Sequence, residues 1–182
     1  MRSLPVLALA ALVALTAVSA VAQSRPGHGG AAAHAPHHPG GGPRRIGKWD
    51  DWIAATHQEA GQTVCYAFTR PSSSNPALPG RGDVVLTVTQ RPGGRDAVAI
   101  TAGFALPRDG EIQVAAEGAT LPFYVSNRSA FAREGRTVVA AFEHARQATA
   151  RFPAPRESVV TDTFSLRGFS QAYAAISRTC PR

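Results

Sequence analysis

The sequence has few of the residues that usually carry catalysis. It contains 2 cysteines and 6 histidines, and only His57 and His144 lie in the part that we expect to fold. It has neither the Gly-x-Ser-x-Gly turn of a serine hydrolase nor a Gly-x-x-x-x-Gly-Lys phosphate loop. Asp50 and Asp51 are adjacent, so on an extended chain they point to opposite sides and form a poor acid–base pair. We therefore predict no catalytic residues, no cofactor and no enzyme activity.

Lysine is almost absent, since Lys48 is the only one and arginine supplies the other basic side chains. The formal net charge is +7, yet the cations are scattered among acids. No basic helix or basic stripe with interleaved aromatics is present, so we predict no nucleic-acid binding. A positive surface favours anionic lipid or acidic glycans, or it serves only solubility.

Long apolar runs are absent except at the start of the chain. Leu4 to Val18 are largely apolar, but this run is shorter than the roughly 20 residues that cross a bilayer. It follows Arg2 and precedes Ala20-Val21-Ala22, a small-residue cleavage site. We predict a signal peptide over residues 1–22 and no membrane span in the mature chain. The protein is then periplasmic, associated with the outer membrane, or secreted; an uncleaved anchor is the alternative.

Residues 23–46 contain no acidic residue and no apolar periodicity, and Gly, Ala, Pro and His dominate them. This composition predicts a flexible linker. It includes His28, His34, His37 and His38, whose imidazoles can bind transition metals. Their spacing matches no closed zinc pattern, so we predict no metal site here.

Residues 47–182 are predicted to form one domain made mostly of strands. Val84, Leu86 and Val88 share one face of a predicted strand, and Val85, Thr87 and Thr89 share the other. Short segments of this kind recur between glycine and proline turns, which predicts an antiparallel β-sandwich. The expected strands are 63–68, 84–89, 97–104, 112–115, 120–126, 148–152 and 158–166, with Pro153 and Pro155 ending the sixth.

Two stretches predict short helices. Thr137 is expected to cap the first, in which Val138 and Phe142 share one face and which ends near Gln147. Ser170 is expected to cap the second. The buried stripe of this second helix is Phe169, Ala172, Tyr173, Ile176 and Cys180.

The only two cysteines are Cys65, in an early strand, and Cys180, on the buried stripe of the last helix. An exported chain with one cysteine pair predicts a disulfide between them. Two free thiols, one of them reactive, are the alternative.

The segment from Thr161 to Tyr173, which reads Thr-Asp-Thr-Phe-Ser-Leu-Arg-Gly-Phe-Ser-Gln-Ala-Tyr and precedes Cys180, is the most distinctive in the chain. It resembles the C-terminal signature of the invasion-associated locus B proteins of alphaproteobacteria. Trp49 and Trp52, the strand with Cys65, and later segments fit the same pattern. The resemblance implies an exported β-rich domain and implies no catalytic mechanism.

Two tryptophans, one arginine and one aspartate are possible binding residues. Trp49 and Trp52 either present aromatic surface to a sugar ring or protein partner, or pack in the core, which we favour. Arg167 is expected to bind backbone carbonyls near the junction of sheet and helix, and Asp162 to make a turn or strand-edge contact. We assign none of them to a binding site.

Two functions remain open from the sequence. The favoured one is a non-enzymatic binding or adhesion module of the bacterial envelope, linked to host-cell contact through its family, with a protein or surface component as partner. Its oligomeric state stays open. The alternative is a periplasmic enzyme or stress-responsive accessory factor whose active groups would include a buried His57 or His144.

Overall fold

The computed structural model describes residues 42–154 and 158–181. The predicted signal peptide and His28, His34, His37 and His38 lie outside these residues. Within the described ranges the elements are β1 (Arg44–Trp49), β2 (Trp52–Glu59), β3 (Gln62–Thr69), β4 (Ser73–Asn75), β5 (Val85–Arg91), β6 (Gly94–Thr101), β7 (Glu111–Ala116), β8 (Ala119–Ser126), β9 (Ser129–Ala132), α1 (Gly135–His144), β10 (Gln147–Ala154), β11 (Ser158–Ser165) and α2 (Phe169–Thr179).

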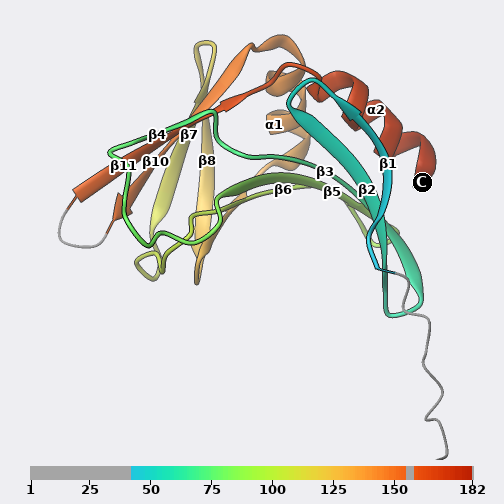
Figure 1. The fold of residues 1–182 in the computed structure, drawn as a ribbon, viewed down its shortest axis with the longest axis horizontal. Coiled ribbons are helices and arrows are strands. Elements are labelled where there is room, and N and C mark those ends of the chain that lie inside the picture. Colours follow the sequence, from blue (N-terminus) through green and yellow to red (C-terminus); the bar gives the residue numbers. More distant parts are fainter. Residues whose placement is uncertain (1–41, 155–157, 182) are drawn as a thin grey trace, which may run out of the picture. The chain divides into compact units, whose positions relative to one another are not determined.

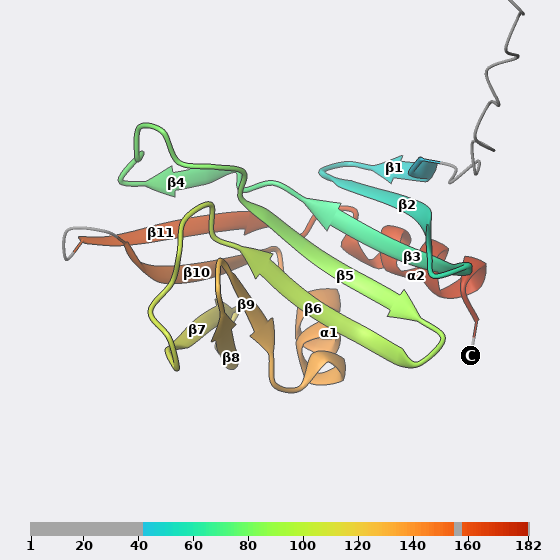
Figure 2. The same cartoon turned by 90° about the horizontal axis from the view of Figure 1, so that it is seen from below.

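The strands of the described ranges form one antiparallel sheet in the order β1-β2-β3-β5-β6-β9-β8-β7-β10-β11-β4. Figure 1 shows β2, β3, β5 and β6 as an arc, with α1 and α2 on its convex side. Figure 2 looks at the opposite face, with both helices behind the strands. The expected fold, mainly β and antiparallel with two short helices, is confirmed. Its sandwich-like core is enclosed by a single bent sheet.

The period-two pattern located most strands correctly because one face of each strand is buried. In β5, Leu86 and Val88 are fully buried, whereas Val85 and Thr87 on the other face are half-buried. One prediction was wrong, since Pro153 lies inside β10, opposite Val159. β10 pairs with β7 only at two earlier residues, so the missing N–H of Pro153 breaks no bond to β7.

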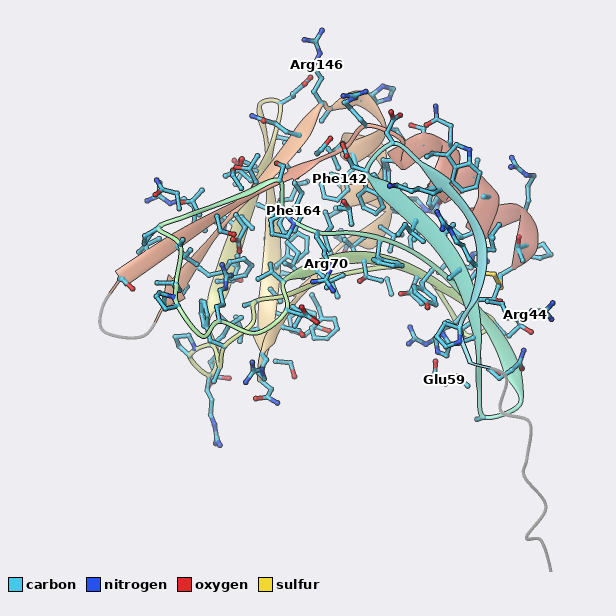
Figure 3. The ribbon with its side chains drawn as sticks, in the orientation of Figure 1. Arg44, Glu59, Arg70, Phe142, Arg146 and Phe164 are labelled. Atoms are coloured by element: carbon cyan, nitrogen blue, oxygen red, sulfur yellow. A yellow bond between two sulfur atoms is a disulfide. The ribbon has the colours of Figure 1, made fainter. Side chains whose placement is uncertain are left out.

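The core is rich in aromatic side chains that join the helices to the sheet. Phe142 of α1 and Phe164 of β11, labelled in Figure 3, are both almost fully buried. Phe169, at the start of α2, packs edge-on against Trp52 and Phe142, with ring centroids 4.9 and 5.6 Å away. Burial of each such ring stabilises the fold by about 1.5–3 kcal/mol.

Both helices form where the apolar spacing predicted them, but their first residues differ from the prediction. Thr137 lies inside α1, which follows Glu134 and ends at His144. Ser170 lies inside α2, which follows Gly168. Neither preceding residue makes a side-chain cap hydrogen bond, so the buried faces of the helices fix their positions. No helix in the described ranges is long and apolar enough to cross a bilayer.

The predicted disulfide between Cys65 and Cys180 is present and links sulfurs from residues 115 positions apart. Cys65 lies on β3 and Cys180 directly follows α2. The bond therefore fastens the last helix to the sheet face that it covers. The alternative of two free thiols is wrong.

Gly168 allows α2 to begin close to the β1–β2 hairpin. Its φ is +84°, and an added Cβ would lie 2.0 Å from the carbonyl oxygen of Trp49. Gly118 is a matched control, because its φ is +86° and an added Cβ would meet no atom within 4 Å. Both alanine substitutions pay the cost of the left-handed conformation, and only Gly168→Ala adds a backbone clash.

We expect Gly168→Ala to lower the free energy of unfolding by about 1–3 kcal/mol more than Gly118→Ala does. Urea unfolding of the two variants measures this difference. Equal losses would show that α2 moves away from Trp49 at little cost.

Candidate functional site

The two faces of the arc differ in what covers them. α1 and α2 pack on one face of β2, β3, β5 and β6. The other face, on the concave side, carries half-buried side chains such as Tyr66, Phe68 and Thr87. Arg70 and Glu59, labelled in Figure 3, lie on this concave side. An open sheet face lined by aromatic side chains is a candidate binding surface.

The strand register arranges this face in lines that cross the sheet. Residues that are directly opposite in an antiparallel pair point to the same side. The first line joins Lys48, Ile53, Phe68, Thr87 and Ala99 from β1, β2, β3, β5 and β6. The second line joins Arg45, Ala55, Tyr66, Thr89 and Ala97 from the same strands. Each line therefore runs from a cation through an apolar and an aromatic side chain to a threonine.

Three rings form a continuous stack on this face. His57 meets Tyr66 edge-on with ring centroids 5.3 Å apart, and Tyr66 stacks on Phe68 at 5.9 Å. Tyr66 and Phe68 are two residues apart on β3, so both project from the same side of the strand. Such pairs hold each other in place, and this stack presents a rigid apolar platform to solvent.

Two open hollows flank the platform and share Phe68. The first, about 290 Å³ in volume, has Ile53 and Phe68 among its lining residues, together with Lys48, Asp51 and Arg70. The second, about 350 Å³, lies against the rings of His57, Tyr66 and Phe68 and is also lined by Val85, Thr87, Thr89 and Arg91. We call these two hollows together the outer groove. Their volumes fall near the lower end of ligand sites.

Ion pairs hold the arginines at the rim of the outer groove. Arg70 donates to Asp83 at 2.8 Å, and both side chains are mostly exposed. This hydrogen bond and the charge of Arg70 lower the pKa of Asp83. Arg91 donates to Glu59 at 2.9 Å, and His57 Nε2 lies 3.8 Å from the same carboxylate. These arginine–carboxylate pairs offer both hydrogen-bond donors and acceptors to a ligand.

Most of the signature segment serves the scaffold, although its Ser165 also lines the first hollow. Asp162 is fully buried and accepts hydrogen bonds from Arg81 at 2.8 and 2.6 Å and from Ser74 at 2.6 Å. Arg81 also donates to the Ala102 carbonyl at 2.7 Å. The expected strand-edge contact of Asp162 is present in its bond to Ser74 on the edge strand β4. Its ion pair with Arg81, which comes from a loop, was not expected.

Two more signature residues tie α2 to its surroundings. Tyr173 donates a hydrogen bond to Asp96 at 2.8 Å, and burial followed by this bond raises the pKa of Tyr173. Arg167 is largely exposed and donates to Asp50 at 3.2 Å. The expected carbonyl contacts of Arg167 were therefore wrong, and its interaction is with a side chain of the β1–β2 turn.

The tryptophans and the adjacent acids lie at the β1–β2 hairpin. Trp52 is fully buried and donates to the Ser165 carbonyl at 3.0 Å, and Trp49 is partly buried. The core interpretation is confirmed for both. Asp50 has a φ of +45° and lies with Asp51 in a turn. The extended geometry expected for this acid pair was therefore wrong.

The two histidines of the folded part lie on different elements. His57 is half-buried on β2 within the outer groove, and His144 is exposed in the last turn of α1. Neither is enclosed in the buried polar cleft that the enzyme alternative requires. In the described ranges, no group of three or more His, Cys, Asp or Glu side chains is placed to hold a metal ion.

The outer groove was missed by sequence reasoning because its residues come from four strands. The signal that existed was local: Tyr66 and Phe68 alternate with buried residues on β3, so their rings had to share the face opposite Cys65 and Ala67. What the sequence did not reveal was that both helices of residues 42–154 and 158–181 lie on the other face.

Comparisons with known proteins agree with this fold. A crystal structure of invasion associated protein B from Bartonella henselae aligns with a TM-score of 0.53 and 16% sequence identity, over 73% of this chain and 95% of that chain. At this identity the likeness shows a shared fold. No curated protein matches the sequence.

The family comparison covers the domain from β2 to α2. The profile described as Invasion associated locus B (IalB) protein matches residues 52–177, well over half of the chain. This match includes both the outer groove strands β2, β3 and β5 and the scaffold segment around Asp162. The chain therefore belongs to the invasion associated locus B family.

Proposed function

We propose that the protein is an exported, non-enzymatic binding module of the bacterial envelope and that the outer groove is its binding surface. The observation that carries this proposal is the stack of His57, Tyr66 and Phe68 on a sheet face that neither helix covers. Aromatic residues with arginines at the rim are typical of interaction surfaces. The partner is a component of the envelope or of a host surface, in keeping with the name of the family.

Export is part of the same proposal. The disulfide between Cys65 and Cys180 supports it, because such bonds persist in oxidising compartments. Residues 1–22 have the composition of a signal peptide. Labelling of intact cells with a reagent that does not cross membranes separates a surface location from a periplasmic one. Protein found only in the cytosol in reduced form would contradict export.

The binding surface is tested by capture of partners from envelope extracts. We expect the mature protein to retain its partner when the histidine-containing linker is deleted and to lose it in the double variant Tyr66→Ala, Phe68→Ala. The loss follows because removal of two stacked interface rings removes most of the apolar contact, and such anchors each contribute about 2 kcal/mol or more to binding.

Tyr124→Ala is the matched control for this variant. Tyr124 is an exposed aromatic, 43% accessible, that stacks on Phe131 in another part of the sheet. The control is expected to keep its partner, and circular dichroism checks that all variants remain folded. Equal capture by the double variant and the wild type, or loss only when the linker is removed, would place binding outside the outer groove.

A further inference from the structure

We propose that the ligand of the outer groove is an acidic polysaccharide, a chain of sugar units that carry carboxylates. This inference rests on the proposed function and specifies its ligand. It follows from the chemistry of the two lines across the sheet. Each line offers a cation from β1, an aromatic ring from β3 and a threonine hydroxyl from β5.

The three kinds of side chain match the three parts of a uronate unit. A pyranose ring has C–H groups on its faces, which pack on an aromatic ring such as Phe68. Its hydroxyls can exchange hydrogen bonds with Thr87, Thr89 and the Arg91–Glu59 pair. Its carboxylate can meet a cation. A neutral apolar ligand would leave the cations unused, and an inorganic anion would leave the platform uncovered.

The repetition of the lines favours a polymer over a single small molecule. The two lines are two residues apart on β2, β3, β5 and β6, which separates them by about 7 Å on those strands. On β1 their cations, Arg45 and Lys48, are three residues apart because the register shifts between Arg45 and Gly47. The same order of cation, ring and hydroxyl occurs in both, so a ligand that repeats its own chemistry can occupy both. Both hollows are open to solvent, and they share Phe68 as a lining residue. A chain can therefore lie along the outer groove and extend beyond it.

The cations on β1 are free for such a ligand. Arg45 and Lys48 are exposed and form no ion pair with any residue in the described ranges. The hollows themselves are lined by Lys48, Arg70 and Arg91 and by one acid, Asp51. Arg70 and Arg91 already have carboxylate partners, so the unpaired charges that line the hollows are those of Lys48 and Asp51. Arg45, which lines neither hollow, adds a second β1 cation and gives a positive excess. The groove is complementary to a negatively charged chain.

The location of the groove favours a polysaccharide over an anionic membrane. The strands that line the groove form the arc of Figure 1, and Arg70, a lining residue of the groove, lies on its concave side (Figure 3). A bilayer surface is broad and nearly flat, so it can meet the exposed cations of β1 but does not enter a concavity to reach Tyr66 and Phe68 on β3. A single polysaccharide chain is narrow enough to enter the concavity and reach the ring platform.

The experiment measures binding of oligomannuronate, with neutral cellohexaose as the uncharged probe of similar length. Calorimetry on the disulfide-bonded mature protein should detect oligomannuronate binding that weakens as salt is raised. The double variant Arg45→Gln, Lys48→Gln should lower the affinity about tenfold. Phe68→Ala should lower it as well, with less dependence on salt.

Arg44→Gln is the matched control, because Arg44 is the neighbouring cation and its register partner, Thr56, belongs to the opposite face. This variant should bind as the wild type does. Three results would overturn the proposal: equal affinity for cellohexaose, an equal loss in Arg44→Gln, or binding to phosphatidylglycerol vesicles without binding to oligomannuronate. If envelope capture still depends on Tyr66 and Phe68 while oligomannuronate fails, the ligand class is wrong and the proposed function stands. If envelope capture does not depend on Tyr66 and Phe68 and oligomannuronate does not bind, both the ligand class and the proposed function are wrong.

Discussion

Replacement of Asp162 by asparagine is expected to lower the free energy of unfolding by about 3–5 kcal/mol. Asp162 is fully buried and pairs with both terminal nitrogens of Arg81, whose side chain is 7% exposed. The substitution leaves the guanidinium buried without a counter-ion, and desolvation of an unpaired charge is costly. Chemical denaturation at neutral pH measures the loss.

The exposed pair Arg70–Asp83 provides the control for this prediction. Its side chains are 60% and 76% exposed, so water solvates either partner when the other is removed. Asp83→Asn should leave the unfolding midpoint almost unchanged. The double variant Arg81→Met, Asp162→Leu should lose less stability than Asp162→Asn, because neither buried charge remains. A similar effect of Asp162→Asn and Asp83→Asn would refute the account of the signature segment as scaffold.

Removal of the disulfide is the second large effect. Cys180→Ser should lower the free energy of unfolding by about 4–5 kcal/mol, because the bond closes a loop whose ends are 115 residues apart and so restricts the unfolded chain. Such a loss is comparable to the whole stability of a small domain. Thermal unfolding followed by circular dichroism measures it.

Reduction gives an independent check on the same bond. A thiol reductant should shift the melting midpoint of the wild type towards that of Cys180→Ser and leave the variant unaffected. We expect Cys65→Ser to behave alike, since either substitution removes the same bond. An unchanged melting curve in both variants would mean that packing of α2 alone fixes it to the sheet.

The sequence predicted those strands and helices in which the spacing of apolar residues matches the residues that are buried. β5 alternates strictly, and the apolar spacing of α2 gathers Phe169, Ala172 and Ile176 on one face. β2 was missed because Ala54 and Ala55 are both buried and so break the alternation. β4 was missed because its three residues are polar and its strand character comes from pairing with β11.

Long-range contacts limited the prediction of the scaffold and of the groove. Asp162 and Arg81 are 81 residues apart, and no local pattern joins them. The outer groove needed the register of four strands and the knowledge that both helices lie on the other face. The cysteine pair was the exception, because two cysteines in an exported chain leave a single pairing.

The most direct test of the outer groove as binding surface is photo-crosslinking in envelope extracts. A benzophenone amino acid replaces Phe68 in one protein and Tyr124 in another, so that each retains an aromatic side chain at its site. We expect a crosslinked partner at position 68 and none at position 124. Crosslinking at position 124 alone, or equally at both positions, would contradict it.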